Sequence, residues 1–401
     1  MSPSSYSPGD ILALASALRN DRTWPSLCFG TDVRPFMGGG SLIYALRFPD
    51  EVAWAFHVFA QDDTSSTADS VASLAQSQAT TFTVLHESGF QRSPKLIHHD
   101  VGHNNPIKAP YLVLSWIPGT ALEWTDTSPS EPQCREKIMR QVVNIQLELA
   151  ECTKVASVGS STYECLCQTV DRKIMRVVDG KEPSITIIDC LEHRALLQHA
   201  VHRSLEFEPP IYAISHEDLA ARNIIVDSDY NITGLIGWTS ARILPLQLAF
   251  RLPRFLATEP DSPIEPVSQL PSDIDLSTFA VQYLHPSPSL IVDRHLVRMH
   301  LASLIAGHDH PERGSLAQVM RHVHSDPDVS WQYLIIEACF TEGLAAWLSN
   351  RNWLLGGTKG QMSRLGDVPR EAIGKEAEKF LAANDGIDQA VREAVLRACG
   401  T

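Results

Sequence analysis

The chain has 401 residues, and 33 lysines and arginines stand against 47 aspartates and glutamates, giving a formal net charge of −14. Hydrophobic residues make up 44% of it, which excludes a disordered chain and, with the length, favours a globular protein of two domains or lobes. The acidic balance argues against a nucleic-acid partner, because neutralising a phosphate backbone requires a basic surface.

The cysteines and the apolar runs bear on where the protein works. Its eight cysteines form no C-x-x-C pair, which favours reduced, mostly buried thiols and a cytoplasmic location. No run of about 18 apolar residues occurs, so we expect no transmembrane helix and no membrane partner. The sequence leaves the oligomeric state open.

The first 115 residues predict a β-rich segment between helices. Apolar positions recur at helical spacing over residues 10–20, and Asp10 fits the N-cap of that helix. β-prone runs separated by turn residues predict a β meander over residues 33–60. A second helix is expected over residues 67–86, and further strands over residues 96–97 and 111–114.

The remaining chain predicts mainly helices with an embedded hairpin. The expected helices cover residues 132–152 and 190–206 and much of the chain after residue 286. Residues 240–285 are rich in proline and read as loop-like. Short strands are expected over residues 211–214, 224–226 and 232–236. The order predicts an α+β protein with a small β-rich part and a larger helical part.

One motif carries chemistry. His216, Asp218 and Asn223 form the pattern H-x-D-x-x-x-x-N just before the predicted hairpin. Phosphoryl transfer to a hydroxyl needs a carboxylate beside the nucleophile and an oxygen ligand that holds Mg²⁺ on the phosphates. A loop with this spacing can bring both groups to one point. These residues can equally be hydrogen-bond anchors that retain the fold without chemistry.

Several segments in order resemble the aminoglycoside phosphotransferase family, a small-molecule branch of the protein kinase-like fold. The string His216-Glu-Asp-Leu-Ala-Ala-Arg-Asn-Ile-Ile-Val-Asp227 is most similar to fungal members. The hairpin over residues 227–236, Trp238 after it and the hinge-like string Ala109-Pro-Tyr-Leu-Val-Leu-Ser-Trp-Ile-Pro-Gly119 fit the same pattern. The resemblance covers about residues 30–260 and implies a two-lobed fold with a β-rich N-lobe and a mainly helical C-lobe.

The resemblance also implies domain boundaries. Residues 1–30 would be an N-terminal helical extension, residues 31–116 the N-lobe, and residues 117–401 the C-lobe with its catalytic-type loop at residues 216–223. The implied cofactors are ATP and Mg²⁺, and the implied partner is a small-molecule substrate.

The family's site residues map onto this sequence one by one. Asp218 would be the catalytic base, His216 a support for its loop and Asn223 a metal ligand. The positions implied to bind the nucleotide are Gly38, Gly39, Gly40 and Ser41 in a glycine-rich turn, His57 on the following strand, and Ser115 and Ile117 in the hinge. The glycine-rich turn can cover phosphates with its backbone N–H groups, or be a plain hairpin turn.

Three charged positions depart from the family pattern. Gly237 stands where the family has a metal-binding Asp, and glycine offers no ligand. His57 replaces a basic Lys or Arg, and an unperturbed histidine, with a pKa of ~6.5, is mostly neutral at pH 7. Gln78 replaces its Glu partner. His57 and Gln78 are expected to form a neutral, hydrogen-bonded pair, which avoids leaving a buried carboxylate unpaired.

These departures leave three hypotheses open. The protein is a small-molecule phosphotransferase with a degenerate nucleotide and metal site, acting in fungal secondary metabolism. Alternatively, it is a non-phosphorylating acid–base enzyme of the cyclase, lyase or isomerase type that uses Asp218 in the interlobe cleft. As a third alternative, it is a non-catalytic pseudokinase scaffold.

Overall fold

The computed structural model describes most of the chain, and everything below concerns the residues it describes. Gly39, one of the predicted nucleotide-binding glycines, lies outside them. The described ranges are 6–28, 35–38, 40–59, 68–156, 159–183, 185–201, 209–257, 288–307, 311–325 and 368–400, with residues 336 and 339.

The chain divides into two compact units. The first comprises Met1–Lys154 and Ile214–Ile243, and the second comprises Val155–Ala213 and Leu244–Thr401. The β-rich N-terminal region and the helical C-terminal region confirm the predicted α+β class. The domain boundary expected at residue 116 stays a prediction. Within the described residues, no helix combines the length and apolar character needed to span a bilayer.

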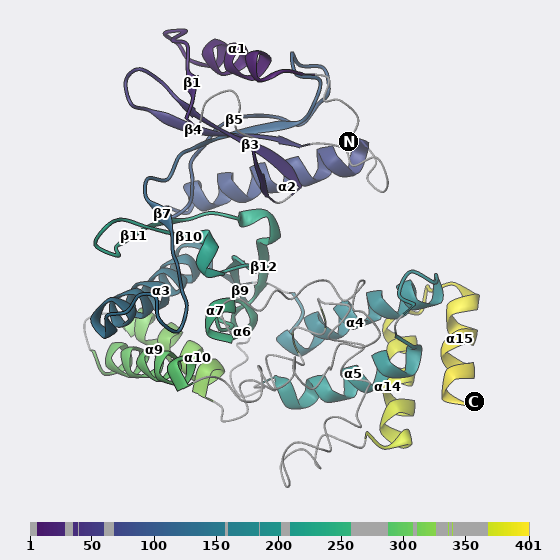
Figure 1. Ribbon diagram of the computed structural model, residues 1–401. Helices are drawn as coiled ribbons and strands as arrows, with labels where there is room; N and C mark the ends of the chain where they lie inside the picture. The colour runs from purple at the N-terminus through teal and green to yellow at the C-terminus, as the bar shows by residue number, and fades with distance from the viewer. Residues whose placement is uncertain are drawn as a thin grey trace. The chain divides into compact units, whose positions relative to one another are not determined.

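A six-stranded antiparallel sheet forms the N-terminal half of the first unit. Its order is β1-β3-β4-β6-β5, with β2 paired to β3. The helices α1 (Pro8–Leu18) and α2 (Ala68–Glu87) lie on opposite sides of this sheet (Figure 1). The strands are β1 (Ser26–Leu27), β2 (Phe36–Gly38), β3 (Ser41–Arg47), β4 (Ala53–Phe59), β5 (Leu96–Asp100) and β6 (Tyr111–Ser115).

The alternation of β4 separates a core face from a cavity face. Trp54, Phe56 and Val58 are buried with the apolar face of α1 in one hydrophobic cluster. Ala55 and His57 point the other way and line a cavity. The alternating pattern of β4 therefore positions His57.

The start of α1 corrects the predicted N-cap. Ser7 is the N-cap, and Asp10 is its capping-box partner three residues later. Asp10 accepts a hydrogen bond from the Ser7 backbone N–H at 2.7 Å, while the Ser7 hydroxyl accepts one from the Asp10 N–H at 3.3 Å. The prediction failed because proline is tolerated in the first helical turn, so the helix begins at Pro8, earlier than its apolar pattern.

A hairpin braced by a long helix completes the first unit. Lys137 Nζ donates to the Asp229 carbonyl at 2.7 Å, and Gln141 exchanges hydrogen bonds with Tyr230 and Ile232. Asp227 shapes the turn by accepting from the N–H groups of Asp229 and Asn231. The elements are β7 (Thr120–Ala121), α3 (Pro132–Thr153), the 3₁₀ turn η2 (Ala221–Asn223), β10 (Ile224–Val226), β11 (Ile232–Leu235) and the 3₁₀ turn η3 (Trp238–Ser240).

The second unit is mainly helical. Its helix α5 corrects the expected helix over residues 190–206: a capping box of Thr186 and Asp189 starts it at Ile187, and it ends at Ala200. β9 (Ile211–Ser215) begins in this unit and pairs with β8 (Val155–Ala156). The helices are α4 (Thr162–Val178), α5 (Ile187–Ala200), α6 (Leu246–Ala249), α7 (Arg254–Ala257), α9 (Pro288–Ala306), α10 (Pro311–Ser325), α14 (Arg370–Ala383) and α15 (Gln389–Cys399), and β12 spans Arg242–Pro245.

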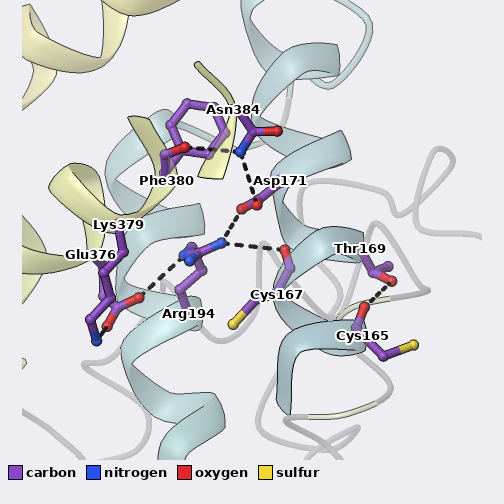
Figure 2. Close-up of polar contacts among 9 residues, drawn as sticks. All are labelled: Cys165, Cys167, Thr169, Asp171, Arg194, Glu376, Lys379, Phe380 and Asn384. Atoms are coloured by element: carbon purple, nitrogen blue, oxygen red, sulfur yellow. Dashed lines mark hydrogen bonds and ion pairs between the residues drawn. The ribbon is translucent and has the colours of Figure 1, made fainter. Parts of the chain in front are cut away.

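A buried ionic cluster joins α4, α5 and α14 (Figure 2). The Arg194 guanidinium, 4% exposed, contacts the carboxylates of Asp171 and Glu376, the latter at 3.2 Å. Asn384 donates to Asp171, and Lys379 pairs with Glu376 at 2.6 Å. Burial raises the pKa of Asp171, whereas the nearby Arg194 opposes that rise. Arg194 therefore compensates two carboxylates that have left water.

We expect Arg194→Met to destabilise the second unit strongly. The substitution leaves the buried Asp171 carboxylate without a cation and leaves Glu376 with Lys379 alone, which costs about 3 kcal/mol in the free energy of unfolding. Arg397→Met is the matched control, because Arg397 pairs with Glu393 on an exposed helix face and should cost less than about 1 kcal/mol. Denaturant unfolding followed by circular dichroism measures both. Equal losses would show that the cluster has no special structural role.

Candidate functional site

A cavity of about 570 Å³ lies within the first unit. Its walls come from β2, β3, β4 and α2, from the segment that follows β6, and from the predicted catalytic loop and the residues after β11. Most of the lining side chains are apolar or aromatic. The lining residues are Phe36, Met37, Gly38, Ile43, Ala55, His57, Gln78, Phe82, Pro94, Leu114, Ser115, Trp116, Ile117, Gly119, Ala121, Asp218, Arg222, Asn223, Ile225, Ile236, Gly237, Trp238, Thr239 and Ser240.

His216 ties the catalytic-type loop to the segment after β11. Its Nε2 lies 2.8 Å from the carbonyl oxygen of Ile236, and its ring packs against Trp238 with centroids 4.5 Å apart. A carbonyl oxygen only accepts, so Nε2 carries the proton of the neutral ring. Burial lowers the pKa of His216 and keeps the ring neutral.

Asp218 lies in a small polar network at the cavity wall. Its Oδ2 accepts hydrogen bonds from Arg222 Nη2 at 2.6 Å and from Asn223 Nδ2 at 2.9 Å. The same Asn223 amide nitrogen donates to the Asp218 carbonyl oxygen at 2.8 Å. The short 3₁₀ turn η2 brings Arg222 and Asn223 back onto Asp218. The structure thus brings together two of the predicted residues and adds Arg222, which was not predicted.

Gly237 packs directly against the Asn223 amide. Its backbone has φ +80°, a conformation that favours glycine. A Cβ built on it would lie 2.7 Å from both Cγ and Oδ1 of Asn223. The amide therefore occupies the space into which any side chain at position 237 would have to project. Gly237 has no side chain that could bind a metal, and for the same reason the Asn223 amide can lie close to its backbone.

His57 and Gln78 both line the cavity but do not form the expected pair. His57 Nδ1 lies 3.3 Å from the Ser41 hydroxyl, and Gln78 Nε2 donates to the Thr239 hydroxyl at 3.3 Å. Ser41 and Thr239, the polar neighbours of these two side chains, come close to them only through tertiary packing. Desolvation lowers the pKa of His57 to about 4, so at pH 7 it supplies no positive charge.

The glycine-rich turn is a tight hairpin between β2 and β3. Gly38 pairs with Ser41, and Gly40 has φ +74°. The Ser41 hydroxyl donates to the Gly38 carbonyl oxygen at 2.8 Å. Of the described residues of this turn, Gly38 lines the cavity, as do the hinge residues Ser115 and Ile117. Whether these positions hold a nucleotide stays a prediction.

Glu217 holds the catalytic-type loop in place, a role that the sequence did not predict. It lies between His216 and Asp218 with φ +63°, uncommon for a residue with a side chain. Its buried carboxylate accepts from the Ser215 hydroxyl and from Arg242 Nη2, both at 2.7 Å. These contacts hold the loop in this backbone conformation and so fix where Asp218 points.

The donor atoms around Asp218 do not fit a magnesium ion. Mg²⁺ prefers octahedral oxygen ligands, typically carboxylates. Here the Asp218 carboxylate is already paired with a guanidinium, which repels a divalent cation. Gly237 contributes no side-chain oxygen. In the described part of the chain, no group of three or more His, Cys, Asp or Glu could hold a metal ion.

Comparison with known proteins finds one family model that covers this site. Residues 60–247, which include the Asp218 loop and Gly237, match the sequence model of the phosphotransferase enzyme family. No curated protein matches the chain. The match confirms the recognition made from the motifs: the chain is aminoglycoside phosphotransferase-like, with the protein kinase-like fold.

Solved structures of similar proteins are distant in sequence. A putative aminoglycoside phosphotransferase from Ralstonia eutropha JMP134 is 10% identical, with a TM-score of 0.47 over 97% of this chain and 98% of that one. A Plasmodium vivax ethanolamine kinase is also 10% identical, with a TM-score of 0.43 over 93% and 88%. ADP-bound aminoglycoside phosphotransferase APH(2'')-Ib is 11% identical, with a TM-score of 0.40 over 90% and 93%. These values are too low to add to the family match.

We expect Gly237→Ala to destabilise the first unit more than a positive φ alone explains. Gly89 has a similar φ of +84° with nothing near its Cβ position, so Gly89→Ala should cost only about 1 kcal/mol of backbone strain. Gly237→Ala adds the clash with Asn223, for a total of about 2–3 kcal/mol. Denaturant unfolding of both variants gives the comparison. Equal costs would mean that Asn223 does not constrain position 237.

Proposed function

We propose that this protein is a small-molecule-binding member of the phosphotransferase enzyme family that does not carry out ordinary Mg²⁺-ATP-dependent phosphoryl transfer. The observation that carries the proposal is the Asn223 amide lying against Gly237, at the position where the family resemblance implies a metal-binding carboxylate. The resemblance of residues 216–227 to fungal members supports a role in fungal secondary metabolism. The scattered free cysteines support a cytoplasmic location.

The missing charges bear on the rate of phosphoryl transfer. Metal ions and cations stabilise its transition state by several kcal/mol, and each ~1.4 kcal/mol changes the rate tenfold. Gly237 removes a metal ligand, and His57, with its pKa of about 4, removes a permanent cation. Arg222 is the one lysine or arginine among the described residues that line the cavity, and Asp218 already offsets its charge. Together these features support a site that does not use Mg²⁺-ATP.

We expect Mg²⁺-ATP neither to stabilise the protein nor to be consumed by it. A nucleotide at 100 times its Kd would add about 2.7 kcal/mol to the free energy of unfolding and raise the Tm, whereas we expect no shift. ADP formation should equal that of the Asp218→Asn variant. A Mg²⁺-dependent rise in Tm together with ADP formation that needs Asp218 would contradict the proposal.

A second candidate is acid–base catalysis by Asp218. Its side chain is 27% exposed and it lines the cavity, so a bound molecule can reach it. Two hydrogen bonds, from Arg222 and Asn223, fix the direction of the carboxylate, and a general base must lie within hydrogen-bond reach of the proton it takes. This geometry supports a cyclase, lyase or isomerase type of reaction without ATP.

For this candidate, Asp218→Asn should abolish product while the fold persists. Asparagine has nearly the same shape and can still accept from Arg222, so the Tm should stay close to that of the native chain. General acid–base catalysis contributes at least about 100-fold, so a strain carrying the variant should accumulate at least that much less product. Metabolite profiling against a deletion strain measures it, and a normal product level would exclude the acid–base role.

A further inference from the structure

The cavity has one positive charge on its wall. Among the described residues that line it, Arg222 is the only lysine or arginine. His57 adds no charge at pH 7, because its pKa lies at about 4. Asp218 is the only carboxylate on the same lining and pairs with Arg222. A multiply charged group such as a triphosphate would meet too few cations here.

Arg222 retains donors for a second anion. Its guanidinium has five N–H donors, and its one hydrogen bond to the described chain runs from Nη2 to Asp218. The side chain is 59% exposed, so Nε and Nη1 can be reached. Arg194 shows that one guanidinium in this chain can serve two carboxylates, since its Nη1 contacts Asp171 and its Nε contacts Glu376 (Figure 2).

The rest of the lining suits an apolar body. Phe36, Phe82, Trp116 and Trp238 face the cavity. A volume of about 570 Å³ lies within the ~300–1,000 Å³ of ordinary small-molecule sites. Such sites combine an apolar lining with a few polar groups that orient the ligand. Here those groups are concentrated at Asp218 and Arg222.

We infer that the cavity takes an apolar small molecule with a single anionic group, which pairs with Arg222 beside Asp218. The inference rests on the proposed function, because it assumes that no Mg²⁺-nucleotide fills the site. In this site Arg222 is the residue that selects a singly charged anion. Asp218 lies next to the bound group and carries the same sign of charge. It therefore weakens the binding of the anion to Arg222.

Two fluorescent probes of similar shape test this inference on the full chain. 8-Anilinonaphthalene-1-sulfonate carries one anionic group, and N-phenyl-1-naphthylamine carries none. We expect Arg222→Gln to weaken binding of the sulfonate about fivefold, the upper range for a partly exposed ion pair, and to leave the uncharged probe unchanged. Arg222→Lys should retain most of the sulfonate affinity. Asp218→Asn should strengthen sulfonate binding and leave the uncharged probe unchanged, whereas partial unfolding would expose apolar surface and strengthen both.

Arg140→Gln is the matched control, because Arg140 is an exposed arginine on α3 paired with Glu136, outside the cavity lining. It should change neither affinity. The inference is overturned if Arg222→Gln changes sulfonate affinity less than about twofold, or weakens both probes equally. Neither result would affect the proposed function. That proposal fails separately if Mg²⁺-ATP displaces the sulfonate and is turned over.

Discussion

The contact of the Asn223 amide with Gly237 organises the polar end of the cavity. A glycine with φ +80° lets the amide lie against the backbone, and the amide nitrogen then donates to both the carbonyl and the carboxylate of Asp218. Arg222, the residue before Asn223 in η2, donates to the same carboxylate. Any side chain at position 237 would have to move Asn223 and so release Asp218. The absence of a side chain at position 237 and the present position of Asp218 are therefore one structural feature.

Two arginines in this chain illustrate how burial changes the role of one kind of ion pair. Arg194 is enclosed by Asp171 and Glu376, and its pairing offsets the cost of moving both carboxylates out of water. Arg222 makes a comparable contact with Asp218 but stays largely exposed, where ion pairs contribute little to stability. The Arg194 cluster joins helices of the second unit, whereas Arg222 presents a cation to the cavity. Because Arg222 is exposed, its guanidinium can bind a ligand.

The sequence predicted the elements whose signals are local. The strands of the hairpin, the loop with Asp218 and the long helices have strong periodicity or turn residues. It missed α4, although Ser161 and Glu164 form a capping box that marks its start. It also missed Arg222, whose place four residues after Asp218 was the available signal. The partners of His57 and Gln78 could not be predicted, because Ser41 and Thr239 reach them only through tertiary packing.

We propose that this site does not hold a divalent cation on a nucleotide. Electron paramagnetic resonance of Mn²⁺ tests it most directly, because manganese replaces magnesium at phosphate sites and its spectrum broadens when it binds to protein. We predict that the spectrum of Mn²⁺ with ATP is the same with and without the protein. A bound, saturable Mn²⁺ species at one per chain, dependent on ATP and lost in Asn223→Ala, would contradict the account.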